Sequence, residues 1–106
     1  MKLNKIQIQK IFRQIDIDEK KIVLIDVMGD KSITSSEKLS NIYCIDQKNN
    51  VIWQVTEIDT KPPYVNDGFV HLKKNEGGEI IAVRFSGFTY KINPETGEAT
   101  QTGFHK

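Results

Sequence analysis

The chain has few of the residues that cross-link a protein or anchor it in a membrane. It holds one cysteine among 106 residues, so it cannot form a disulfide within itself. Small secreted scaffolds usually depend on such bridges, and a reducing compartment suits this composition better. No apolar run approaches the roughly 18 residues that a membrane-spanning helix needs. The opening MKLNKIQIQK also lacks the apolar core of a signal peptide. We therefore expect a cytoplasmic protein with no membrane partner.

The chain also has no large excess of positive or negative charge. There are 15 lysine and arginine residues and 14 aspartate and glutamate residues, which leaves no overall field to attract nucleic acid. The charge is nevertheless uneven along the chain. Residues 1–13 carry four basic side chains and no acidic one, whereas residues 14–80 carry 12 acidic and 8 basic side chains. This pattern fits either an acidic face beside a basic end or an ordinary mixed surface.

Recognisable catalytic and metal-binding arrangements are missing too. His71 and His105 have no partner at metal-ligand spacing, and one cysteine cannot build a zinc cluster. Cys44 lies in an apolar run without a basic neighbour, which disfavours a Cys44–His71 nucleophile pair. None of the seven glycines falls in a phosphate-binding motif. The sequence therefore predicts neither an enzyme nor a bound metal or cofactor.

Two charged residues stand inside apolar strands. Asp26 and Arg84 each lie between two apolar neighbours. Each side chain could occupy the solvent side of a half-buried strand. The alternative is that the two residues pair with each other across a sheet.

The chain does contain a series of short apolar runs separated by turn signals. The richest is residues 42–55, two alternating arms around Asn49 and Asn50, which holds Cys44 and the only tryptophan, Trp53. This pattern is typical of a β-hairpin. Strands are predicted at residues 22–28, 33–34, 40–45, 51–57, 69–73, 79–85, 88–92 and 98–102.

Residues 5–14 carry two conflicting patterns. Asn4 followed by Gln7 fits a helix N-cap with its capping-box partner. Isoleucines that alternate with polar residues, at positions 6 and 8 and again at 15 and 17, are typical of a strand instead. We favour a short amphipathic helix over residues 5–14, because apolar residues recur at helical spacing. That stripe is Ile8, Ile11, Phe12 and Ile15.

These patterns together predict the fold class. We expect one domain over residues 1–106, mainly β. Its predicted architecture is an antiparallel β-sandwich or flattened barrel of seven to eight strands with one short N-terminal α-helix. The strict alternation of strands and helices that a parallel sheet requires is missing.

The central hairpin has a second copy near the C-terminus. Residues 43–54 and 90–101 share the pattern Tyr-x-Ile-Asp/Asn and a final glutamine. Each copy is predicted to turn through an Asx residue and then a residue that tolerates positive φ. These residues are Asp46 and Asn50 in the first copy and Asn93 and Gly97 in the second.

Residues 43–53 and 92–97 resemble blades of quinoprotein-type β-propellers. In those blades a strand that ends in Leu/Ile-Asp turns through Thr-Gly and returns to a tryptophan. Two blades cannot close a propeller, which takes at least about four. The resemblance therefore implies, at most, a subunit of a propeller-like assembly.

One segment is arranged for contact with a partner. Residues 59–68 (DTKPPYVNDG) hold two of the three prolines, so they are predicted to form a stiffened loop rather than a strand. A tyrosine on such a loop is a frequent binding anchor, and nearby acids would give it a negative rim. The alternative is a plain crossover between sheets. The candidate partner-binding residues are Glu57, Asp59, Tyr64, Asn66 and Asp67.

In general character the chain resembles the immunity proteins of bacterial toxin–immunity systems, including contact-dependent growth inhibition. It is small, rich in isoleucine, lysine and asparagine, and predicted to be β-rich and without catalytic groups. The resemblance implies a protein that neutralises a toxin, such as a nuclease, by covering its active site. Its acidic middle section would then steer it to a basic partner. Two alternatives stay open: a propeller-like assembly subunit, or a carrier of a small apolar ligand with Arg84 as the anchor inside a barrel.

Overall fold

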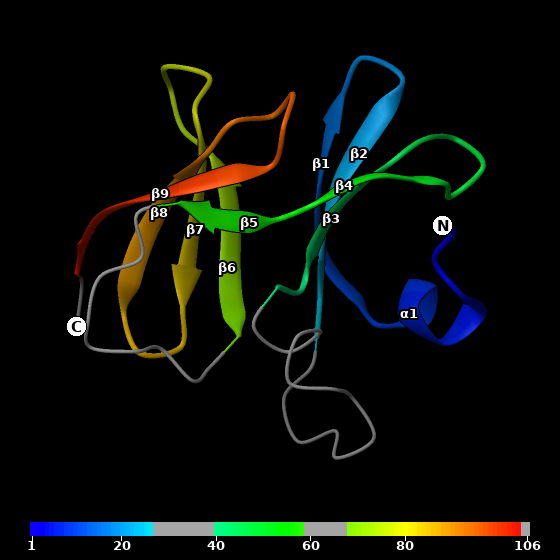
Figure 1. Cartoon of the computed structure of the whole chain (residues 1–106), viewed down its shortest axis with the longest axis horizontal. Coiled ribbons are helices and arrows are strands. Elements are labelled where there is room, and N and C mark those ends of the chain that lie inside the picture. Colours follow the sequence, from blue (N-terminus) through cyan, green and yellow to red (C-terminus); the bar gives the residue numbers. More distant parts are fainter. Residues whose placement is uncertain (27–39, 59–67, 105–106) are drawn as a thin grey trace.

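The computed structural model describes residues 1–26, 40–58 and 68–104 (Figure 1). Within them, one helix and nine strands form two sheets, a four-stranded sheet in the order β1-β2-β3-β4 and a five-stranded sheet in the order β5-β9-β8-β7-β6. The predicted fold class, mainly β with one short N-terminal helix, is confirmed. The elements are α1 (Lys5–Gln9), β1 (Ile11–Ile17), β2 (Lys20–Ile25), β3 (Ile42–Ile45), β4 (Val51–Gln54), β5 (Thr56–Ile58), β6 (Phe69–Lys74), β7 (Ile80–Arg84), β8 (Phe88–Ile92) and β9 (Glu98–Phe104).

The two sheets pack face to face. On one side the chain passes from β4 directly into β5 and so crosses from the first sheet to the second (Figure 1). On the other side β6 lies close to β1 and β2. Neighbouring strands are antiparallel except β5 and β9, which are parallel. The result is a sandwich that is joined by the chain along one side and has strand edges along the other.

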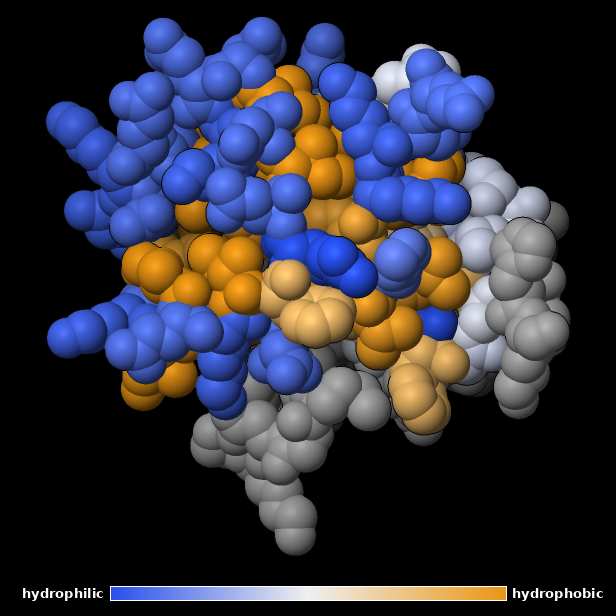
Figure 2. Space-filling view, turned by 180° about the vertical axis from the view of Figure 1, so that it is seen from behind, coloured by the Kyte–Doolittle hydropathy of each residue, from blue (hydrophilic) through white to orange (hydrophobic). Residues whose placement is uncertain are grey.

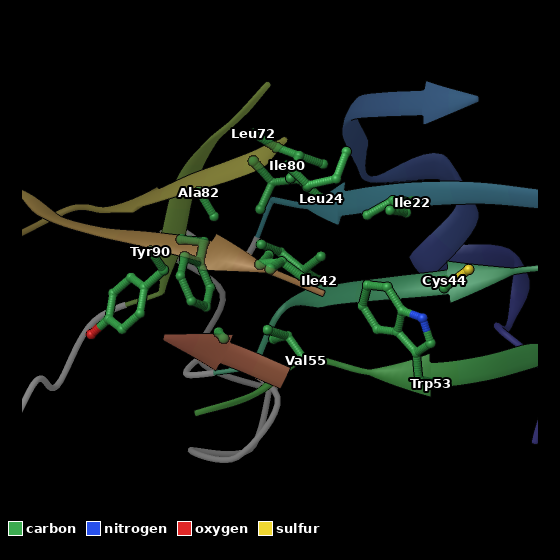
Figure 3. Close-up of a cluster of buried hydrophobic side chains, with 13 residues drawn as sticks. Ile22, Leu24, Ile42, Cys44, Trp53, Val55, Leu72, Ile80, Ala82 and Tyr90 are labelled. Atoms are coloured by element: carbon green, nitrogen blue, oxygen red, sulfur yellow. The ribbon is translucent and has the colours of Figure 1, made fainter. Parts of the chain in front are cut away.

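The main core fills the space between the sheets. Figure 3 shows aliphatic side chains from both sheets meeting there, with the Trp53 indole at one end. The cluster takes residues from β2, β3 and β4 on one side and from β6, β7, β8 and β9 on the other. Its buried members are Ile22, Leu24, Ile42, Cys44, Trp53, Val55, Phe69, Leu72, Ile80, Ala82, Tyr90, Ile92 and Ala99.

A second core covers the other face of the first sheet. Helix α1 and the segment before it lie on that face, on the side away from the second sheet (Figure 1). This explains why β3, and β2 from Ile22 onward, are apolar at successive positions: both faces of these strands are buried. The buried members are Leu3, Val23, Ile25, Tyr43 and Ile45, with Ile8, Ile11 and Val51 packed against them.

The helix prediction for residues 5–14 is right only at its start. The capping box forms: the Gln7 amide donates to Asn4 Oδ1 at 2.8 Å, and the Asn4 amide donates to Gln7 Oε1 at 2.9 Å. The helix ends at Gln9, however, and β1 begins at Ile11. The strand pattern prevails because β1 pairs with β2 and its later isoleucines pack against the main core.

The central hairpin forms with two differences. Asp46 Oδ1 accepts hydrogen bonds from the amides of Lys48 and Asn50 at 2.8 and 2.9 Å, as the Asx-turn prediction requires. The residue with positive φ is Asn49 (66°), not the predicted Asn50. The predicted strand 51–57 is split at Val55, because Thr56 donates its amide to the carbonyl of Gly97 and β5 joins the second sheet.

The predicted strands after residue 68 correspond to β6, β7, β8 and β9, within two residues at each end. The second hairpin copy also forms: Asn93 Oδ1 accepts from the Glu95 amide at 2.9 Å, and Gly97 has the predicted positive φ of 80°. The two copies lie in different sheets, β3–β4 in the first and β8–β9 in the second. The predictions for residues 27–28, 33–34 and 59–67 lie outside the described residues.

Trp53 connects the two hairpin copies. Its indole Nε1 donates to the carbonyl of Pro94 at 2.9 Å. A Cβ atom placed on Gly97 would lie 2.5 Å from Cε3 of the indole, so glycine is required both for its φ and for this close approach.

Gly97→Ala is expected to destabilise the protein by about 1–3 kcal/mol more than Gly78→Ala. The two glycines have nearly the same φ, 80° and 81°, but a Cβ on Gly78 meets nothing within 4 Å. The loss of stability in Gly78→Ala therefore measures the cost of placing alanine at a positive φ. The additional loss in Gly97→Ala measures the steric clash with Trp53. Urea unfolding followed by Trp53 fluorescence gives both values. Equal costs for the two variants would contradict the close packing of the indole on Gly97.

Candidate functional site

Arg84 is a buried charge at the end of β7. Its side chain is 3% exposed and forms an ion pair with the carboxylate of Glu57, on β5. Its Nε donates to the hydroxyl of Tyr90 at 3.3 Å, and its guanidinium lies 4.1 Å from the centre of the Phe69 ring. Burial lowers the pKa of Arg84 from its ordinary value, and the bond to Tyr90 opposes that effect. The guanidinium stays charged at neutral pH.

Asn41 is a buried amide that bonds the main chain of Phe69. Its Oδ1 accepts from the amide of Phe69 at 2.8 Å, and its Nδ2 donates to the carbonyls of Phe69 and Ile25 at 2.9 and 2.8 Å. Asn41 thereby links the end of β2 in the first sheet to the start of β6 in the second. We call Asn41, Glu57, Phe69, Arg84 and Tyr90 the polar joint.

The polar joint connects the two sheets. One of its members, Glu57, is a predicted partner-binding residue. The carboxylate on Arg84 is that of Glu57 rather than the hypothesised Asp26, whose side chain is exposed at the end of β2. The other four predicted partner-binding residues lie outside the described residues: Asp59, Tyr64, Asn66 and Asp67. Asn41 was missed, although an asparagine directly before a wholly apolar strand is a signal for a buried amide.

The residues considered for nucleophilic or metal chemistry are placed as follows. Cys44 is buried in the main core, where burial raises the pKa of its thiol more than the positive charge of Lys20 lowers it. That environment does not favour a thiolate nucleophile. His71 is half-buried on β6, opposite Val83. Within the ranges that the structure describes, no three His, Cys, Asp or Glu side chains gather closely enough to hold a metal ion.

The described residues line a groove and a smaller hollow on the surface. A groove of about 620 Å³ runs along the ends of β7, β8 and β9, and the Lys91 ammonium lies 2.5 Å from the carboxylate of Glu79 at its side. The bonds from Lys91 and Asn75 lower the pKa of Glu79. A smaller apolar hollow of about 260 Å³ lies between β1, β2 and β6. It is lined by Phe12, Leu24, Ile25, Asp26, Phe69 and Val70.

Acidic side chains mark one end of the sandwich. The β1–β2, β6–β7 and β8–β9 turns point to the same end of the molecule (Figure 1). Each of these turns carries an exposed carboxylate, and the lysines near this end lie on the strands. We call Asp18, Glu19, Glu76 and Glu95 the tip acids. They are different residues from the predicted partner-binding set, which lies between 57 and 67.

Two packed sheets with a filled interior and acidic turns at one end define this chain as a small β-sandwich domain. A family model described as "Domain of unknown function (DUF7957)" matches residues 3–104, so the chain belongs to that family. No curated protein and no solved structure matches the chain. The single helix among the described residues is too short to cross a membrane.

Proposed function

We propose that this chain is a cytoplasmic immunity protein that neutralises a bacterial toxin, most simply a nuclease, by binding over its active site. The observation that carries the proposal is the set of tip acids at one end of the sandwich. A nuclease must present basic groups to the phosphates of its substrate. Carboxylates on hairpin turns are a suitable complement to such a surface, because the turns that carry them are part of the folded sheets.

Electrostatic attraction would act mainly on the association rate. Exposed charges on two partners raise the rate of encounter at low salt, and the effect fades as salt screens them. The predicted residues Glu57, Asp59, Tyr64, Asn66 and Asp67 belong to the proposal as a second contact region, with Tyr64 as its anchor. The carrier alternative has less support, because side chains from both sheets fill the interior and Arg84 already pairs with Glu57.

If the proposal holds, a neighbouring gene encodes the toxin, and co-expression of the two is expected to restore growth of cells that the toxin alone kills. Reversing single tip acids, as in Glu76→Lys and Glu95→Lys, should slow association about tenfold at low salt, with a smaller effect at high salt. Asp26→Lys is the matched control, since this exposed acid lies at the opposite end of β2. Surface-plasmon or stopped-flow kinetics measure the rates. Failure to rescue growth, with no binding between the purified proteins, would rule the function out.

A further inference from the structure

The side of the sandwich opposite the β4–β5 crossover exposes an edge strand and apolar surface. Strand β1 is outermost in its sheet, and no described strand pairs with its outer edge. Figure 2 shows the molecule from behind, with hydrophobic side chains gathered across the middle of that face and hydrophilic ones around them. Phe12 on β1 is 57% exposed, and Ile15 and Ile17 are only partly buried. Proteins usually protect such edges, so an edge that no described strand pairs with, beside exposed apolar side chains, points to a partner.

The hairpin geometry fixes which main-chain groups face outward. The two-residue turn Asp18–Glu19 makes Ile17 and Lys20 the closing pair of the β1–β2 hairpin. In an antiparallel pair, hydrogen-bonded residues alternate with residues whose amides and carbonyls point to the other side. Ile15 and Ile17 therefore direct their main-chain groups to β2. Gln14 and Asp16 direct theirs to the free edge.

This edge is complementary to itself. A second copy can lie antiparallel along β1 with Ile15 opposite Ile15 of that copy, and each Gln14 then faces an Asp16. All four outward-facing residues form main-chain bonded pairs in this register. The side chains also match, because Gln14 Nε2 already donates to Asp16 Oδ1 within one chain at 3.1 Å. Centring the pair on Asp16 instead would place two like charges directly opposite, which is unfavourable.

We propose that the chain forms a symmetric dimer through β1, centred on Ile15, so that the two four-stranded sheets become one continuous sheet. The pairing places the half-buried Ile15 side chains of the two copies side by side. It uses the edge of the sandwich and leaves the polar joint, Glu76 and Glu95 outside the strand pairing, whereas the tip acid Asp18 lies opposite Phe12 of the second copy. The dimer is independent of the proposed toxin binding, and either can fail without the other.

Sedimentation or light scattering of the purified chain over a dilution series is expected to show the mass of two chains, falling to one on dilution. The charge at position 14 then tests the register. Gln14→Asp should raise the dissociation constant of the dimer about three- to tenfold, because it places a second negative charge opposite Asp16. Gln14→Lys should lower it, because it places a positive charge there. Each effect occurs twice in the symmetric dimer. Position 14 is exposed, so neither variant should alter folding, which the thermal midpoint checks. Thr100→Asp and Thr100→Lys, on the exposed face of β9, are the matched controls.

Ile15→Cys tests the centre of the pairing directly. Two cysteines opposite each other in a non-hydrogen-bonded antiparallel pair lie close enough to form a disulfide. Mild oxidation should give a cross-linked dimer, whereas Ile81→Cys, also half-buried but on β7, which is paired on both edges, should not. A single-chain mass at every concentration up to the millimolar range would overturn the dimer. Equal responses to Gln14→Asp and Gln14→Lys, or no cross-link through position 15, would overturn this register.

Discussion

Replacing Asn41 with alanine is expected to lower the free energy of unfolding by roughly 3–5 kcal/mol. The amide of Asn41 is fully buried and makes three hydrogen bonds to the main chain. Alanine would leave the amide and carbonyl of Phe69 and the carbonyl of Ile25 without this partner in a dry interior. Each buried polar group that loses its partner costs about 1–3 kcal/mol.

Urea unfolding of Asn41→Ala and Asn41→Asp measures the effect. Aspartate keeps the shape and can still accept from the Phe69 amide, but as a carboxylate it cannot donate to the two carbonyls. It should therefore be at least as damaging as alanine. Gln54→Ala is the control: this amide also donates two hydrogen bonds, to the carbonyl of Ser40 and the hydroxyl of Tyr43, but it is half-exposed and water can replace it. A cost for Asn41→Ala no larger than that for Gln54→Ala would show that the amide does not join the sheets.

The parts of the fold that depend on neighbouring residues could be predicted from the sequence. The Asn4–Gln7 capping box and the turns at Asp46 and Asn93 follow from side chains that bond the main chain a few residues away. The strands after residue 68 follow from apolar runs bounded by turn residues. Periodicity over one short window did not decide where α1 ends, because the same isoleucines fit a helix and a strand.

Features that depend on distant residues could not be predicted. The division of one predicted strand into β4 and β5 depends on Gly97, more than forty residues along the chain, whose carbonyl accepts from Thr56. In the sequence Glu57 is an acidic residue beside a predicted loop, but in the fold its carboxylate forms an ion pair with Arg84 on β7. The tip acids are spread from Asp18 to Glu95, and only the topology of the two sheets brings them to one end. Local patterns predict elements, whereas a binding surface depends on how those elements meet.

Glu57→Gln is expected to destabilise the protein by about 2–4 kcal/mol, because it leaves the buried guanidinium of Arg84 without its carboxylate. Arg84 is 3% exposed and cannot recover this loss by turning to water. Arg84→Met should cost less, since Glu57 is 15% exposed and can be hydrated, and methionine can fill the space against Phe69. Once Arg84 is methionine, the further change Glu57→Gln should cost almost nothing.

The double-mutant cycle of Glu57→Gln and Arg84→Met, measured by urea unfolding, isolates the coupling between the two groups. Glu79→Gln and Lys91→Met form the matched cycle for an exposed pair, whose side chains are 43% and 55% exposed. Water solvates both of those groups, so their coupling should be far smaller and should vanish with added salt. The coupling of the buried pair should persist in salt. Similar couplings in the two cycles would contradict the view that the carboxylate of Glu57 stabilises the buried guanidinium of Arg84.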